Sequence, residues 1–152
     1  MGRSDHARPG PGYVFTEREF GDCRIRLDFW ISKGGNSGVY VRQPVRKFGP
    51  TGDQRSAHSP GDGVEIQIDY KDGKNLTGAV YNRKNSLKVA GGEERWNTYE
   101  IECKGDRLAI RLNGDPVNDY SPVPLRGAIG MQIHGGQPHD HVVRFRNIEV
   151  TE

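Results

Sequence analysis

Apolar and polar residues alternate with a period of two along most of this chain, which is the pattern of half-buried β-strands. The segment CRIRLDFWI (23–31) carries an apolar residue at every second position, and VEIQIDY (64–70) repeats the pattern. Because successive side chains of a strand point to opposite faces, each segment supplies one face for a core and one for solvent. No segment shows a convincing helical period, so we predict an all-β chain.

Turn signals separate further segments of the same kind. Asn113-Gly114 is typical of a β-hairpin, and a change of apolar phase inside 142–150 predicts a β-bulge near Arg146 and Asn147. Many short antiparallel strands of this kind predict a two-sheet β-sandwich or jelly roll. The remaining predicted strands cover 38–43, 76–82, 97–103, 107–113, 117–120, 128–134 and 142–150.

Composition agrees with this class and excludes others. The 152 residues suit one domain, and Val plus Ile total 21 against 12 for Ala plus Leu, which favours strands. A net charge of +2 is too small to suggest nucleic acid, and no apolar run exceeds three residues, so we expect no membrane span. We predict a flexible N-terminal tail over 1–12, a single domain over 13–152, and a long functional or disordered loop over 44–63.

Three rows of polar side chains lie on the outward phase of predicted strands. Aromatic rings beside carboxylates, amides and a guanidinium suit a sugar, whose ring has apolar faces and a rim of hydroxyls. If the rows belong to neighbouring strands of one sheet, they form a groove for a sugar ligand. The rows are Glu65, Gln67 and Asp69, then Tyr40 and Arg42, then Gln132 and His134.

Several segments together resemble the 3-keto-disaccharide hydrolase domain family, a concanavalin-like jelly roll of bacterial sugar metabolism. The resemblance is carried by NSGVYVR, WNTYEI, the LNG hairpin and the FRNI ending, and it runs from about Phe15 to Val150. It implies a hydrolase that cleaves the glycosidic bond of a sugar oxidised to a ketone at carbon 3. Family members are usually exported, although MGRSDHARPGPG at the start of this chain has no apolar core of a secretory signal.

The chemistry implied by the resemblance requires a general base, an acid for the leaving group and a stabiliser of an enolate. We assign Glu65 or His134 as base and acid, and Arg42 as the electrostatic stabiliser. No cofactor and no metal are expected. The predicted sugar contacts are Gln67, Asp69, Tyr40, Tyr81, Gln132, Asn36 and Trp30.

Three other carbohydrate functions stay open as alternatives, first among them a non-catalytic carbohydrate-binding module. A laminarinase-like glucanase would use Glu65 and Asp69, but four residues of strand span about 13 Å, and glycosidase carboxyls lie ~5–9.5 Å apart. An alginate-lyase-like enzyme would use Gln132 and His134, but the tyrosine- and lysine-rich C-terminal motif is absent.

Histidines and cysteines allow two further readings. His134, His139 and His141 lie close in sequence beside Asp140, and this spacing suits a divalent ion, but a solvated turn is the simpler interpretation. Cys23 and Cys103 fall on the inward phase of their strands. They are predicted as buried free thiols, with a disulfide as the alternative.

Overall fold

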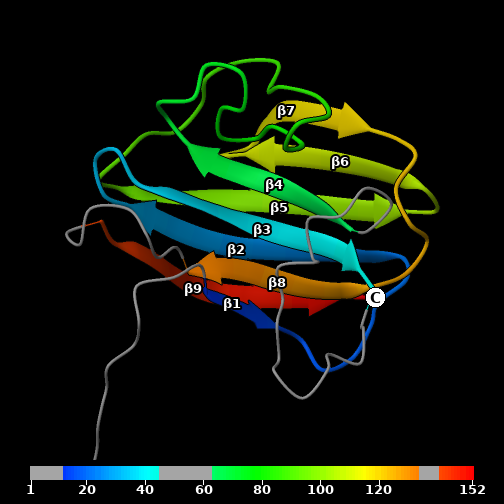
Figure 1. Cartoon of the computed structure of the whole chain (residues 1–152). Coiled ribbons are helices and arrows are strands. Elements are labelled where there is room, and N and C mark those ends of the chain that lie inside the picture. Colours follow the sequence, from blue (N-terminus) through cyan, green and yellow to red (C-terminus); the bar gives the residue numbers. More distant parts are fainter. Residues whose placement is uncertain (1–11, 45–62, 134–140) are drawn as a thin grey trace, which may run out of the picture.

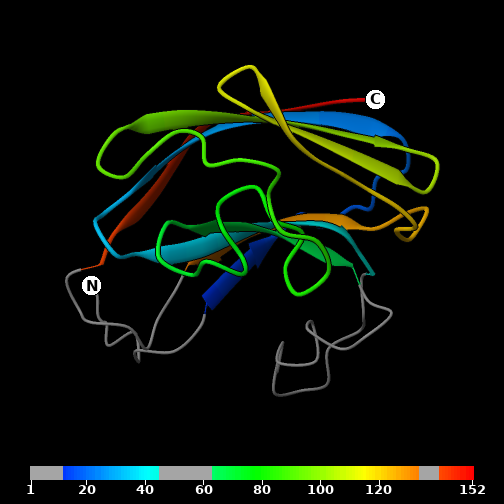
Figure 2. The ribbon, with the colours of Figure 1, turned by 90° about the horizontal axis from the view of Figure 1, so that it is seen from above.

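The chain folds into a sandwich of two antiparallel β-sheets (Figures 1 and 2). In this computed structural model, residues 12–44, 63–133 and 141–152 are described, and within them there are nine strands and no helix. The strands are β1 (Gly12–Phe15), β2 (Cys23–Ile31), β3 (Asn36–Gln43), β4 (Val64–Asp69), β5 (Trp96–Lys104), β6 (Arg107–Leu112), β7 (Asp115–Tyr120), β8 (Ala128–Ile133) and β9 (Val143–Thr151).

One sheet has four strands in the order β1-β8-β3-β4, and the other has five in the order β7-β6-β5-β2-β9. Seen from above, the two sheets form separate layers with their inner faces toward each other (Figure 2). Their order places strands far apart in sequence side by side, such as β2 and β9. The predicted all-β, two-sheet jelly roll is confirmed.

The core lies between the sheets and is built from the inward phase of the alternating strands. Ile25, Leu27 and Phe29 of β2 are fully buried, while the residues between them face outward. The ring of Tyr99 packs 5.0 Å from that of Phe29. The Tyr99 hydroxyl crosses to the other sheet and donates a hydrogen bond of 2.6 Å to the carbonyl of Gln67.

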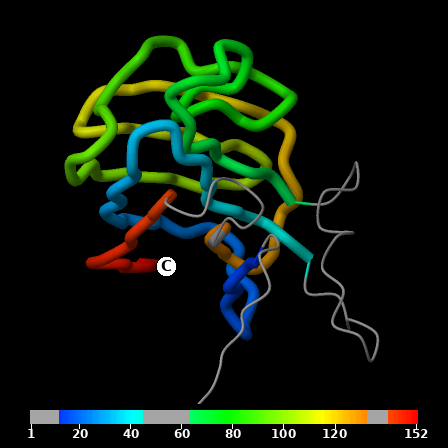
Figure 3. The backbone as a smooth tube through the Cα atoms, turned by 60° about the vertical axis from the view of Figure 1, so that its left-hand side comes forward, coloured from blue at the N-terminus to red at the C-terminus, as the bar shows by residue number. Residues whose placement is uncertain are grey.

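The predicted strand over 76–82 is wrong. This part of the chain forms turns with one isolated bridge from Val80 to Ile66, because Gly78 adopts a left-handed backbone conformation (φ 98°) that interrupts an extended strand. The turns still bond to β4: the amides of Gly78 and Tyr81 donate to backbone carbonyls there. The connection between β4 and β5 therefore runs along one edge of the sandwich, where it bonds to β4 and, through the amide of Leu87, to β7 (Figure 3).

Other boundaries differ slightly. Strand β3 begins at Asn36, two residues before the predicted start at Gly38, and β1 begins at Gly12, the last residue of the predicted tail. The predicted bulge in β9 is confirmed: its register against β2 shifts between Arg26 and Asp28, and Asn147 has φ 54°. The rest of the predicted tail and most of the predicted 44–63 loop (45–62) lie outside the described residues.

Within the described ranges, no helix is long and apolar enough to cross a membrane.

Candidate functional site

The outer face of the four-stranded sheet gathers most of the predicted site residues. Directly opposed residues of neighbouring strands point to the same face, so the register fixes their arrangement. One row across the sheet contains Glu65, Tyr40, Gly130 and Phe15, from β4 to β1. The next row contains Gln67, Gly38, Gln132 and Tyr13, and Asp69 stands opposite Asn36 in the row beyond.

Two glycines make room for side chains that lie flat on this face. A Cβ atom at Gly38 would come within 2.3 Å of the Glu65 Oε2 atom, and one at Gly130 would come within 2.3 Å of the Phe15 ring. These distances are far below van der Waals contact. The face is therefore shaped so that the Glu65 carboxyl rests above β3.

The acidity of Glu65 is shifted toward neutral pH on this face. Its residue is only 8% exposed, and burial raises the pKa of the carboxyl to about 7, although the hydrogen bond from Tyr40 acts in the opposite direction. A charged carboxylate is costly to bury, so the protonated form is favoured up to neutral pH. The group can therefore both take and release a proton near neutrality.

A chain of hydrogen-bonding side chains leads to Glu65. The hydroxyl of Tyr40 bonds to the Glu65 carboxyl and to the hydroxyl of Tyr13, and Tyr13 also bonds to Gln132. The rings of Tyr13 and Tyr40 meet edge to face with centroids 5.5 Å apart, and Phe15 packs 5.7 Å from Tyr40. Burial raises the pKa of both tyrosines, so each stays a neutral donor at physiological pH.

The amide of Gln132 is the clearest unfilled position on this face. Gln132 is 8% exposed, and its Oε1 atom has no hydrogen-bond partner among the described residues. A buried carbonyl oxygen without a donor is unfavourable by about 1–3 kcal/mol. A ligand hydroxyl would satisfy it.

Asp69 and Asn36 hold each other in place. The Asp69 Oδ2 atom accepts a 3.0 Å hydrogen bond from the Asn36 amide, and its Oδ1 atom accepts from the backbone amides of Lys71 and Asp72. One carboxylate oxygen of Asp69 therefore fixes the turn after β4, and the other holds Asn36 of β3. Asp69 positions Asn36, and its role as a direct sugar contact stays a prediction.

Tyr81 joins the face from the connection after β4. Its backbone amide donates 2.9 Å to the carbonyl of Glu65, which places Tyr81 next to the carboxylate-bearing strand. Its neighbour Val80 is fully buried in the core. The Tyr81 side chain is half-buried.

Arg42 does not lie on this face, which corrects its predicted role as electrostatic stabiliser. The β3–β8 register shifts after Tyr40, and Arg42 has φ 55°, so the expected alternation stops there. The guanidinium is buried and donates to the carbonyls of Gly105, Pro124 and Gly21. All its contacts are structural and lie at the end of the sandwich.

Trp30 also lies elsewhere. It belongs to β2 and stands opposite Trp96 on the outer face of the five-stranded sheet, on the far side of the sandwich from Glu65. The guanidinium of Arg144 lies 5.0 Å from the Trp30 ring, and that of Arg146 lies 3.8 Å from Trp96. Trp30 is therefore not part of the Glu65 site.

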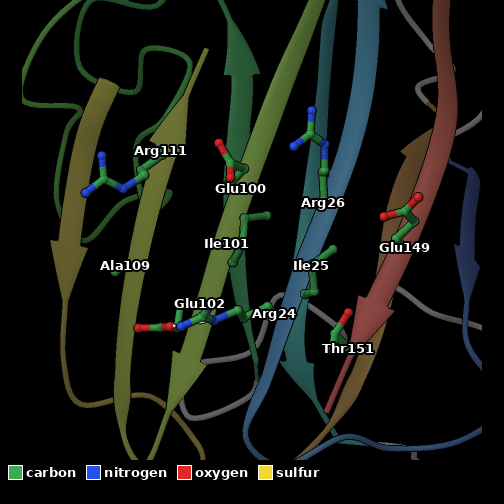
Figure 4. A pocket seen from close by; sticks show the side chains of 10 residues that line it. All are labelled: Arg24, Ile25, Arg26, Glu100, Ile101, Glu102, Ala109, Arg111, Glu149 and Thr151. Atoms are coloured by element: carbon green, nitrogen blue, oxygen red, sulfur yellow. Dashed lines mark hydrogen bonds and ion pairs between the residues drawn. The ribbon is translucent and has the colours of Figure 1, made fainter. Parts of the chain in front are cut away.

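That second outer face contains a depression of about 510 Å³ lined with charged side chains (Figure 4). Arg26 stands between Glu149 and Glu100 across three strands, and Arg24 forms a 2.9 Å ion pair with Glu102. Positive and negative side chains alternate and compensate one another. The arrangement is typical of a solvated sheet surface and offers no buried group for catalysis.

Most residues of the predicted histidine cluster lie outside the part of the chain that the structure describes. His134, His139 and Asp140 lie outside the described residues, and His141 follows them at the start of the last described range. Among residues 12–44, 63–133 and 141–152 no group of three His, Cys, Asp or Glu side chains is arranged to hold a metal ion.

Sequence reasoning missed Tyr13 and Phe15. The segment GYVF is too short to show a period, and it follows a stretch rich in glycine and proline. Two aromatic residues spaced by one position are a weak signal of a strand face. That signal becomes informative once β1 is paired with β8.

Comparisons with known proteins agree with this geometry. A Parabacteroides distasonis protein provisionally assigned as a glycosyl hydrolase is 25% identical, with a TM-score of 0.73 over 92% of this chain and 82% of the other. The carbohydrate-binding module CBM66 of Bacillus subtilis is 17% identical (TM-score 0.66; 99% and 84% covered). The Caenorhabditis elegans galectin LEC-6 is 15% identical (TM-score 0.56; 99% and 100% covered). The last two likenesses concern the fold alone.

No protein with a curated description matches the chain in sequence. A family model does match: it describes a 3-keto-alpha-glucoside-1,2-lyase-like domain and covers residues 3–151, nearly the whole chain. Together with the Parabacteroides protein, this match identifies a carbohydrate-active jelly-roll domain. The chain therefore belongs to the 3-keto-disaccharide hydrolase domain family, as its sequence motifs predict.

Proposed function

We propose that this domain cleaves the glycosidic bond of 3-keto-glycosides on the outer face of the four-stranded sheet, with Glu65 as the general base. The observation that carries the proposal is a buried carboxyl with a pKa of about 7, resting on a glycine and bonded to a phenol. A general base is most effective when its pKa lies near the working pH. No cation of the described residues contacts this carboxyl, so it is not held for an ion pair.

The reaction follows from the acidity of the substrate. A ketone at carbon 3 acidifies the proton on carbon 2, and the Glu65 carboxylate removes that proton. The electron pair moves into the carbonyl and gives an enolate. When the carbonyl re-forms, a double bond forms between carbons 1 and 2, and the bond from carbon 1 to the glycosidic oxygen breaks. The released oxygen takes a proton, and water then adds to the unsaturated sugar.

The other groups of the face supply recognition. The Gln132 Oε1 atom accepts a sugar hydroxyl, and Asn36, oriented by Asp69, offers a further hydrogen-bonding amide. Tyr81 contacts the sugar from the edge beside Glu65. His134, two residues beyond Gln132, is our candidate for the acid that protonates the leaving oxygen.

A binding-only role is the second candidate, and the position of Arg42 favours it. Arg42 is the only cationic residue in strands β1, β3, β4 and β8, and it is bonded to carbonyls at the end of the sandwich. These strands therefore offer an enolate hydrogen bonds and no positive charge. The same surface would hold a sugar without turning it over.

A matched pair of variants separates the two candidates. Glu65→Gln removes the base and keeps the shape, while Glu100→Gln makes the same change on the opposite sheet. We expect Glu65→Gln to abolish release of aglycone from a 3-keto-glucoside while calorimetry still detects sugar binding, and Glu100→Gln to behave like the parent protein.

Full turnover by Glu65→Gln would exclude Glu65 as the base. A parent protein that binds the sugar and never releases aglycone, with or without a chelator, would establish the binding module instead.

A further inference from the structure

Two cysteines that the proposed chemistry does not use face each other inside the sandwich. Cys23 begins β2, and Cys103 lies near the end of β5, directly opposite it in the antiparallel register. Both are free thiols, 6% and 2% exposed. They belong to the core cluster between the sheets, at the same end of the molecule as the Arg42 guanidinium.

The spacing suits a covalent bond. Opposed residues of antiparallel strands have Cα atoms about 4.5–5.5 Å apart, and disulfides span about 4.4–6.8 Å. The thiols are already within hydrogen-bond distance, with Cys103 as the donor to Cys23. The usual separation of opposed residues on antiparallel strands therefore falls within the range that a disulfide spans.

The charges around the pair make one sulfur the better nucleophile. The hydrogen bond from Cys103 and the positive charge of Arg42 lower the pKa of Cys23, against burial and the carboxylates of Asp22 and Glu152. Donation to Cys23 and burial raise the pKa of Cys103. Cys23 is therefore the thiol that reacts first, and it is the more exposed of the two.

We propose that Cys23 and Cys103 are a dithiol site that closes to a cross-strand disulfide by exchange with a small disulfide such as oxidised glutathione. The Cys23 thiolate attacks one glutathione sulfur and releases the other glutathione as a thiolate. Cys103, as its thiolate, then attacks the Cys23 sulfur and releases the second glutathione. The two cysteine protons end on the two released thiols, so the protein loses two electrons and one oxidised glutathione gains them.

The disulfide would connect the same two chain segments that Arg42 already connects by hydrogen bonds. Arg42 donates to the carbonyl of Gly21, two residues before Cys23, and to that of Gly105, two residues after Cys103. Guanidinium and disulfide would thus hold the same two chain segments together. A disulfide closing the 23–103 loop also restricts the unfolded chain, so it stabilises the fold.

The test uses the folded full-length chain incubated with oxidised glutathione, then denatured, alkylated and weighed by mass spectrometry. We expect both thiols to become unreactive, with the loss of two hydrogen masses, no retained glutathione and no dimer. The oxidised protein should unfold at a higher temperature than the reduced protein. The gain in unfolding temperature should be larger in an Arg42→Lys variant. Lysine cannot make all the hydrogen bonds by which Arg42 already holds the carbonyls of Gly21 and Gly105 together.

Cys23→Ala and Cys103→Ala provide the controls, and each should keep one alkylatable thiol or carry one glutathione. Two alkylated thiols in the treated parent protein, two glutathione adducts, or a cross-linked dimer would each overturn the proposal. Because the parent protein alone gives these readouts, a control that fails to fold does not weaken the test. The result is independent of whether the Glu65 face turns over a sugar.

Discussion

The two outer faces of the sandwich treat polar side chains in opposite ways. On the four-stranded sheet, Glu65, Gln67 and Gln132 point outward and are nevertheless buried. On the five-stranded sheet, Arg24 and its partner Glu102 keep 78% and 44% of their side chains exposed. One face withdraws polar groups from water, and the other leaves them in it.

This difference indicates where function resides. Burying a polar group is unfavourable unless a partner satisfies it. A face that buries several polar side chains is therefore a candidate for ligand binding. Cross-strand ion pairs in solvent contribute little to stability or recognition. The more conspicuous charges of the five-stranded face are thus the less informative ones.

The largest difference between the faces should appear in the pH dependence of stability. The Glu65 carboxyl has a raised pKa of about 7 in the folded state, against 4.5 in the reference state, so the folded protein binds the proton more tightly. The stabilisation that protonated Glu65 contributes to the folded state is fully present below the unfolded pKa of 4.5. It is lost as the pH rises through about 7, by about 3 kcal/mol in all. Denaturant unfolding of Glu65→Gln and the parent across this range should show the variant gaining by that amount.

Glu100→Gln on the other face is the control for that measurement and should follow the parent at every pH. If the difference between Glu65→Gln and the parent is the same at low and high pH, Glu65 is not held protonated.

Enlarging one side chain on each face should separate the two faces again. Gly38→Ala places a Cβ where the Glu65 Oε2 atom lies, so the carboxyl must move by an ångström or more. A displacement of this size lowers turnover by about a hundredfold. Ala109→Val enlarges an exposed residue of the five-stranded face and should leave turnover of a 3-keto-glucoside unchanged. Equal kinetics for both variants would show that the position of Glu65 is not critical.

Removing one phenol should give a smaller effect. Tyr40→Phe deletes the hydrogen bond that lowers the pKa of Glu65, so that pKa should rise by up to about one unit. If the carboxylate is the base, the pH at which turnover is half-maximal should move upward by the same amount. A profile that stays in place or moves downward would contradict the role of Tyr40.

The smallest effect belongs to the exposed charges. Arg26→Gln removes the central cation of the row from Glu149 to Glu100, and the free energy of unfolding should change by less than about 1 kcal/mol. The change should shrink further in high salt, and sugar turnover should be unaffected. A larger loss, or any loss of turnover, would mean that the two faces are coupled.

Much of the fold could be predicted because the period-two pattern is local and physical. The segment 23–31 matches β2 residue for residue, and the phase change before Ile148 correctly indicates the bulge at Asn147. The failure at 76–82 came from Gly78, whose left-handed conformation turns an apparently alternating segment into a series of turns. A single glycine in such a segment does not reveal which conformation it adopts.

The site was predictable to the extent that side chains follow strand alternation. Glu65, Gln67 and Gln132 reached one face because β4, β3 and β8 are neighbours. The predicted position of Arg42 was wrong because a backbone irregularity two residues after Tyr40 turns the Arg42 side chain away from this face. The prediction for Trp30 was wrong for another reason. Alternation shows which residues of one strand share a face, and it does not show which sheet that strand joins.

The backbone of β4 has one further consequence. Chain beyond Asp69 folds back and occupies the amide and carbonyl of Gln67 and the carbonyls of Glu65 and Asp69. An outermost strand with vacant backbone groups invites a strand from another molecule and so promotes aggregation. Here the strand that carries Glu65 is already bonded on its outer side, so the proposed sugar-binding surface can face solvent while that edge offers fewer vacant groups to a strand from another molecule.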